Sequence, residues 1–120
     1  MSIHLFSDPT MQGLEYALNS LSLRQQVLSN NIANAQTPGY AAQDVSFESQ
    51  LSNIFAGAAT SGPGDAGTTT NSPDRTTRQD GNSVGMEAEM SKTTQTNILY
   101  DALSQLTADR LGILKAAING

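Results

Sequence analysis

The chain has 120 residues, which is enough for one domain with a modest core. Its net charge of −5, with only six scattered basic residues, excludes the positive surface that nucleic-acid binding requires. It contains no cysteine, which excludes disulfides and thiolate metal sites.

Residues 1–8 are expected to form a loose N-terminus. The N-terminal stretch lacks the basic region and the long apolar run of a cleavable secretory signal, and no run of about twenty apolar residues suggests a transmembrane helix. The only histidine, His4, lies in this segment, so a catalytic triad has no base and a histidine metal site has too few ligands. The sequence therefore predicts no enzyme, no metal and no cofactor.

Residues 9–36 are predicted to form a helix about 40 Å long. Asp8 and Pro9 supply an N-cap followed by proline at the first helical position, and Pro38 disfavours the helical conformation of the residue before it. The polar Gln25 either specifies the register of the apolar repeat or lies at its rim. That repeat alternates steps of four and three, as in a coiled-coil seam, and its apolar members are Leu14, Leu18, Leu21, Leu28, Ile32 and Ala35.

The stretch LSNNIANAQTPGY, residues 28–40, closes this helix. Pro38 and Gly39 suit the two central positions of a type II turn, where the glycine takes a positive φ. The turn does not explain the asparagines before it, which lower helix propensity. We expect Asn31 and Asn34 to hydrogen-bond to a neighbouring chain or to the arm after the turn. The predicted turn motif is Thr37, Pro38, Gly39 and Tyr40.

Two unlike segments follow. Residues 37–55 hold the turn and a short arm, with apolar side chains such as Val45, Phe47 and Ile54 that can pack back on a neighbour as an extended stretch or a helical turn. Residues 56–83 are rich in glycine and contain no aromatic residue, so they are predicted to be a flexible linker. The glycines of SGPGDAG in this linker lack the lysine and the preceding strand of a phosphate-binding loop.

Residues 84–120 are predicted to form a second helix, about 50 Å long. No proline lies between Met86 and Ile118. Glu87 and Glu89 lie in its first turn, where the helix dipole favours negative charge, and both are expected to be solvated. One broad apolar face carries Leu99, Leu103, Leu106, Ile113 and Leu114.

The expected fold is all-α, with the two terminal helices packed as an antiparallel, coiled-coil-like pair. Helices of this length pair along one seam, which leaves the rest of the second helix's apolar face exposed for association. We therefore expect the isolated chain to be partly helical and to complete its core on other subunits. The predicted assembly interface comprises Leu14, Leu18, Leu21, Leu28, Asn31, Ile32, Asn34, Leu99, Leu103, Leu106, Ile113 and Leu114.

The motif SNNIANAQTPGY, residues 29–40, resembles the N-terminal signature of the flagellar rod, hook and hook-associated protein family. That signature, Asn-Ile-Ala-Asn-Ala-x-Thr-x-Gly-Tyr, combines asparagines, small residues and a turn. The stretches RQDGNSVGMEAEM, residues 78–90, and NILYDALSQLTADRLGILKAAING, residues 97–120, are similar to the proximal-rod members. The short chain agrees with this, because hook and distal-rod relatives carry extra domains.

The resemblance implies a structural subunit of the basal-body proximal rod. Such subunits are exported through the flagellar type III apparatus without a cleaved signal and assemble into a tube across the periplasm through their terminal helices. The implied partners are copies of the chain itself, other rod subunits such as FlgC, the adaptor FliE and the membrane-ring protein FliF, with no nucleic acid and no direct membrane insertion.

Three alternatives stay open at this point. The first alternative is the proximal-rod protein FlgC, which shares the motif of residues 29–40. A cytosolic flagellar export chaperone or adaptor would use the same helices to hold a client. A peptidoglycan hydrolase is disfavoured, because the sequence contains no constellation of base, nucleophile or metal ligands.

Overall fold

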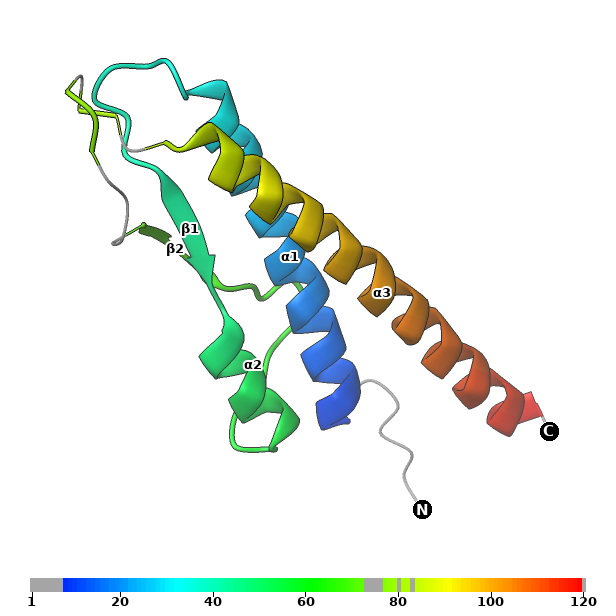
Figure 1. The fold of residues 1–120 in the computed structure, drawn as a ribbon. Helices are drawn as coiled ribbons and strands as arrows, with labels where there is room; N and C mark the ends of the chain where they lie inside the picture. The colour runs from blue at the N-terminus through cyan, green and yellow to red at the C-terminus, as the bar shows by residue number, and fades with distance from the viewer. Residues whose placement is uncertain (1–7, 73–76, 80, 83, 120) are drawn as a thin grey trace.

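The computed structural model describes residues 8–72, 77–79, 81–82 and 84–119. Two long helices lie side by side, and a short helix and the first strand of a two-stranded sheet pack against the first of them (Figure 1). The molecule is elongated, with extents of 62 × 25 × 17 Å. In chain order the elements are α1 (Pro9–Ala33), β1 (Gln43–Ser46), α2 (Glu48–Phe55), β2 (Thr68–Asn71) and α3 (Met86–Asn119). The fold is therefore mostly helical, with a small sheet that the expectation of an all-α fold did not include.

α1 begins and ends where nearby side chains satisfy its unpaired backbone groups. The Asp8 side chain accepts a hydrogen bond from the Thr10 backbone N–H at 3.3 Å, and Pro9 occupies the first helical position. At the other end, the Asn34 side chain donates to the Asn30 carbonyl at 2.8 Å. The Thr37 N–H donates to the Asn34 carbonyl at 3.0 Å. These local bonds replace the next helical turn, so α1 ends at Ala33 and not at residue 36.

α3 runs antiparallel to α1 (Figure 1). Three polar contacts cross between the helices: Asp8 with Arg110, Gln25 with Asn97 and Asn31 with Glu89. In these pairs the residue number on α3 falls as the number on the α1 side rises, as expected for antiparallel helices. Beyond Arg110, α3 continues for about two turns past the start of α1. The terminal helices thus pack together over most of the length of α1.

The arm after the turn consists of β1 and α2, and it lies along α1 (Figure 1). β2 pairs antiparallel with β1, with Val45 opposite Thr69 and Ser46 opposite Thr68. β2 lies inside residues 56–83, so the expectation of a flexible linker fails for this part of the segment. The pairing forms because a run of threonines favours extended backbone and because β1, which lies far earlier in the sequence, offers an edge to pair with.

The main core lies between α1, the arm and α3. Its buried members come from α1 and the arm, and Tyr100 and Leu103 of α3 pack against them. Those buried members are Tyr16, Leu21, Val27, Val45, Phe47 and Ile54. Because the arm supplies three of them, the strand and the short helix belong to the same folded unit as the long helices.

Residues 56–67 join α2 to β2, and we call them the connector. Gly67 allows the connector to pass directly over β1. A Cβ atom at this position would lie 2.5 Å from the Ser46 carbonyl oxygen and 2.6 Å from the Phe47 Cβ. The Gly67 N–H also donates to the Ser20 hydroxyl at 3.0 Å, which ties the connector to α1. A larger residue would therefore have to push backbone away from backbone.

We expect Gly67→Ala to destabilise the chain by about 1–3 kcal/mol, because no side-chain rotation relieves its clash with β1. Gly112→Ala is the matched control, since a Cβ atom there meets nothing within 4 Å. In that open helical position alanine should stabilise by roughly 1 kcal/mol. Urea unfolding followed by circular dichroism measures both changes, and equal effects of the two substitutions would contradict the close approach.

Candidate assembly site

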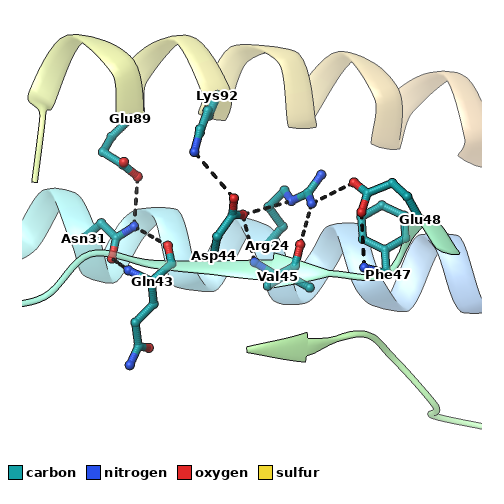
Figure 2. Close-up of polar contacts among 9 residues, drawn as sticks. All are labelled: Arg24, Asn31, Gln43, Asp44, Val45, Phe47, Glu48, Glu89 and Lys92. Atoms are coloured by element: carbon teal, nitrogen blue, oxygen red, sulfur yellow. Dashed lines mark hydrogen bonds and ion pairs between the residues drawn. The ribbon is translucent and has the colours of Figure 1, made fainter. Parts of the chain in front are cut away.

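Asn31 joins α1, the arm and α3 through one side chain (Figure 2). Its amide nitrogen donates to the Gln43 carbonyl at 2.8 Å and to the Glu89 carboxylate at 2.9 Å. Its amide oxygen accepts from the Gln43 N–H at 3.1 Å and from the Tyr40 hydroxyl at 3.3 Å. An asparagine side chain offers two donors and two acceptor lone pairs. Asn31 is fully buried and uses all four.

Asn34 has a different role from Asn31. Its side chain donates to the Asn30 carbonyl and accepts from the Thr37 hydroxyl at 3.1 Å, so it completes the end of its own helix. We expected both asparagines to hydrogen-bond either to a neighbouring chain or to the arm, and Asn31 does bond to the arm. The Asn34 side chain instead bonds within α1 and the turn, which differs from the expectation.

A second segment, distant in the sequence, caps the turn. The Asn82 side chain donates to the carbonyls of Asn34 and Thr37 at 2.8 and 2.6 Å, and the Arg78 guanidinium donates to the Ala35 carbonyl. Gly39 has φ +77° and Gly81 has φ +79°, and a Cβ atom on Gly81 would lie 3.2 Å from the Gly39 Cα. The two glycines therefore let the turn and the residues before α3 meet backbone to backbone.

Arg24 fastens the arm to the middle of α1 (Figure 2). Its guanidinium donates to the Val45 carbonyl and to the Glu48 carboxylate at 2.9 Å, and lies 4.7 Å from the centre of the Phe47 ring. Asp44 lies 3.6 Å from the Arg24 Nε and 3.5 Å from the Lys92 Nζ. A charged network thus links α1, the arm and α3.

The pKa of Glu48 is held below its ordinary value of 4.5. Burial raises it, but the hydrogen bond from Arg24, the backbone N–H groups of Phe47 and Glu48, and the charge of Arg24 together outweigh burial. A carboxyl whose pKa is lowered by folding stabilises the fold fully above its unfolded pKa, and loses that contribution as the pH falls through the lowered value. The Glu48 contribution is therefore present above pH 4.5.

We expect the urea midpoint of the native chain to fall toward that of Glu48→Gln as the pH drops below 4.5. At pH 7 the free energy of unfolding of the native chain should exceed that of Glu48→Gln by about 0.2–1 kcal/mol, the usual range for a largely exposed ion pair. Glu87→Gln is the control, because Glu87 is exposed in the first turn of α3. A difference between Glu48→Gln and the native chain that stays constant from pH 7 to about pH 3 would contradict the lowered pKa.

Two heptad stripes run along α3. The first faces α1 and consists of buried and half-buried residues at steps of four and three; we call it the inner seam. It comprises Glu89, Thr93, Thr96, Tyr100, Leu103, Thr107, Arg110 and Leu114. More than half of its members are polar, so the pairing of the long helices combines apolar contact with polar contacts.

The second stripe, the outer seam, lies about a third of a turn round the helix from the inner seam. Leu99, Leu106 and Ile113 carry it, with exposures of 50%, 52% and 69%. Its members recur at steps of three and four: Leu99, Ala102, Leu106, Asp109, Ile113 and Ala116. Within the described chain this row of large apolar side chains is left largely uncovered, which is typical of a surface that packs on another protein.

The predicted interface residues divide into three groups. Leu14, Leu21, Leu28 and Asn31 are buried within the chain. Leu99, Leu106 and Ile113 are exposed on the outer seam. The half-buried members are Leu18, Ile32, Asn34, Leu103 and Leu114, and in the turn motif Tyr40 is half-buried whereas Thr37, Pro38 and Gly39 are exposed. The single apolar face expected on the second helix is therefore divided between the two seams.

Several residues that organise the site were not expected from the sequence. Glu89 was expected to be solvated but is buried against Asn31, so that expectation is wrong. Arg24 and Asn82 carried no periodic signal, because each binds backbone carbonyls of a segment far away in the sequence. For Glu89, its place at the start of the heptad steps of the inner seam was a signal that could have indicated burial.

The surface of the described chain carries both polar and apolar hollows. A polar hollow of about 460 Å³ lies between Tyr16, Phe47, α2 and the connector, and is lined mainly by hydroxyl and amide side chains. Among the described residues, no three His, Cys, Asp or Glu side chains gather as metal ligands would. None of the described helices has the length and apolar character needed to cross a membrane.

Residues 11–40, from α1 through the turn, match the family model described as Flagella basal body rod protein. The chain is 35% identical to the flagellar basal body rod protein FlgB of Bacillus subtilis, over 97% of each chain. It is 38% identical to FlgB of Agrobacterium fabrum over 72% of this chain and 75% of that protein. Against FlgB of Yersinia enterocolitica, identity is 44% over 48% of this chain and 42% of that protein. The similarity thus extends over both long helices and is not confined to the N-terminal motif.

Proposed function

The chain belongs to the FlgB family of flagellar basal body rod proteins, and from this premise we propose that it assembles through the outer seam of α3. It is a structural subunit of the rod and is located in the flagellar basal body. Its relatives carry the FlgB name, so the sister rod protein FlgC is not favoured. Association with other rod components follows from membership of the rod.

The observation that carries the proposed interface is the row of exposed side chains at Leu99, Leu106 and Ile113. Their heptad spacing matches the spacing of knobs that insert between the side chains of a second helix. Burying a leucine or isoleucine stabilises an interface by about 1.5–3 kcal/mol. The outer seam therefore fits an α-helix of a neighbouring subunit.

The remaining partners and the route are part of the same proposal. We expect neighbours of four kinds: copies of this chain, FlgC-like rod subunits, the adaptor FliE and the membrane-ring protein FliF. The subunit would leave the cytoplasm through the type III apparatus without a cleaved signal, and it would catalyse no reaction. Its elongated shape and small core support this, because such a chain unfolds readily for export and gains contacts on assembly.

Co-purification tests the proposal against the alternative of a cytosolic export chaperone. A tagged copy of the chain, expressed in place of the native copy, should be found in detergent-purified basal bodies and should resist removal by salt. A chaperone would remain in the cytoplasmic fraction. Recovery of the tagged chain only in that fraction, in cells that do assemble flagella, would refute the rod assignment of this copy.

A further inference from the structure

The helix pairing of this chain uses the less apolar of the two seams of α3. Over residues 99–116, the outer seam has five apolar residues among its six members. The inner seam over residues 100–114 has three among five, with Thr107 and Arg110 between them. Apolar burial alone would therefore favour turning α3 by about a third of a turn, so that the outer seam faced α1.

Polar contacts oppose that rotation. Each joins a side chain of α1, or of its cap, to one on the inner side of α3: Asp8 with Arg110, Gln25 with Asn97 at 2.8 Å, and Asn31 with Glu89 at 2.9 Å. They are spread along nearly the whole of α1. Rotating or sliding α3 would break all of them at once, because each depends on the angular position of its α3 residue.

Glu89, which is fully buried, gives the strongest indication that polar contacts fix the orientation of α3. A buried carboxylate with a polar partner contributes little net stability compared with apolar packing, and its best-attested use is to fix the register of paired helices. Its partner Asn31 is itself held by both backbone groups of Gln43, so its amide points in a fixed direction. Only one orientation of α3 presents a carboxylate to that amide.

We propose that these polar pairs select which seam of α3 packs on α1, and so keep the outer seam available for a helix of a partner. The value of this selection for assembly rests on the proposed function. The selection itself is a property of the single chain. It can therefore be tested on dilute monomer, where failure of the assembly proposal has no effect on the result.

Two reporters measure the orientation of α3 in this cysteine-free chain. Thr96→Cys places a thiol of nearly the same size on the inner seam, and Ala102→Cys places one on the outer seam. In the otherwise native chain, we expect maleimide to label the outer thiol at least about 100-fold faster than the inner one, because labelling of the buried thiol requires local opening.

The test variant carries Gln25→Leu, Glu89→Thr and Arg110→Thr, which remove one partner from each polar pair and leave the inner seam no more apolar than before. The partners left behind are exposed or bonded elsewhere: Asn97 is exposed, Asn31 keeps its bonds to the arm, and Asp8 keeps its bond to Thr10. The matched control carries Gln26→Leu, Glu87→Thr and Lys115→Thr, which are similar changes at exposed positions.

In the test variant the inner thiol should label at least about tenfold faster and the outer thiol at least about threefold slower, since α3 now populates the rotated orientation. The control should label like the native chain. If only the inner thiol accelerates, the polar pairs merely hold the helices together and the proposal is wrong. If the triple variant loses its helicity, the single substitution Gln25→Leu in the otherwise native reporter chain is used to test the proposal. It should still slow the outer thiol measurably, and an unchanged rate overturns the proposal.

Discussion

Asn31→Ala should lower the free energy of unfolding by about 3–5 kcal/mol, because it leaves the buried Glu89 carboxylate without the Asn31 amide and removes the clamp on Gln43. Typical domains are stable by only about 5–15 kcal/mol, so much of the population would unfold on mild heating. Urea unfolding followed by circular dichroism gives the difference directly. The loss should also affect the arm, because Asn31 is bonded to both backbone groups of Gln43.

Asn30→Ala is the matched control for this prediction. Asn30 is the preceding residue on the same helix, but its side chain is exposed. Alanine has a higher helix propensity than asparagine, so the control should be neutral or stabilising by a few tenths of a kcal/mol, on the order of 0.5. Equal losses in the two variants would show that the cost comes from the helix and not from the junction of α1, the arm and α3.

The sequence predicts the long helices well because their signals are local. The Asp8-Pro9 start, the heptad leucines of α1 and the proline-free run of α3 each act within a few turns. The boundaries shift only where side chains intervene, as at Asn34, whose amide bonds end α1 before Pro38 does. The apolar and polar residues along a single helix are therefore enough to indicate that a helix forms.

The small sheet and the seam choice depend on contacts between distant segments. β2 forms because Gly67 lets the connector approach β1, and no periodic pattern in either segment specifies that pairing. The apolar pattern of α3 alone favours one broad face, whereas Glu89 and Arg110 place the contact with α1 on another side. A helical projection counts apolar residues and cannot weigh a buried amide against them.

The same contacts divide the predicted assembly residues into those that build the subunit and those that remain for its neighbours. Leu21 and Leu28 are fully buried, so replacing them would test folding and not assembly. Leu103 is half-buried and packs on the core, which makes it unsuitable for an assembly test for the same reason. Leu106 and Ile113 are the positions at which an assembly defect can be separated from a folding defect.

Leu106→Asp combined with Ile113→Asp should leave the isolated subunit folded and reduce its incorporation into basal bodies at least about 100-fold. Each substitution forfeits about 1.5–3 kcal/mol of apolar burial against a neighbouring helix and adds a charge to the contact. At about 1.4 kcal/mol for each factor of ten, two such losses are enough. Immunoblots of purified basal bodies measure incorporation, and swimming in soft agar measures the consequence for motility.

Ala108→Asp combined with Asn119→Asp adds the same two charges at exposed positions of α3 that lie away from both seams. This control should retain incorporation and motility, because its charges meet solvent on the monomer and do not enter the proposed contact. Free energies of unfolding of both variants within about 0.5 kcal/mol of the native value would exclude a folding defect, since exposed substitutions rarely cost more. Normal motility of the outer-seam variant would mean that assembly does not use this surface, whereas a defect shared with the control would indicate that added charge anywhere on α3 is harmful.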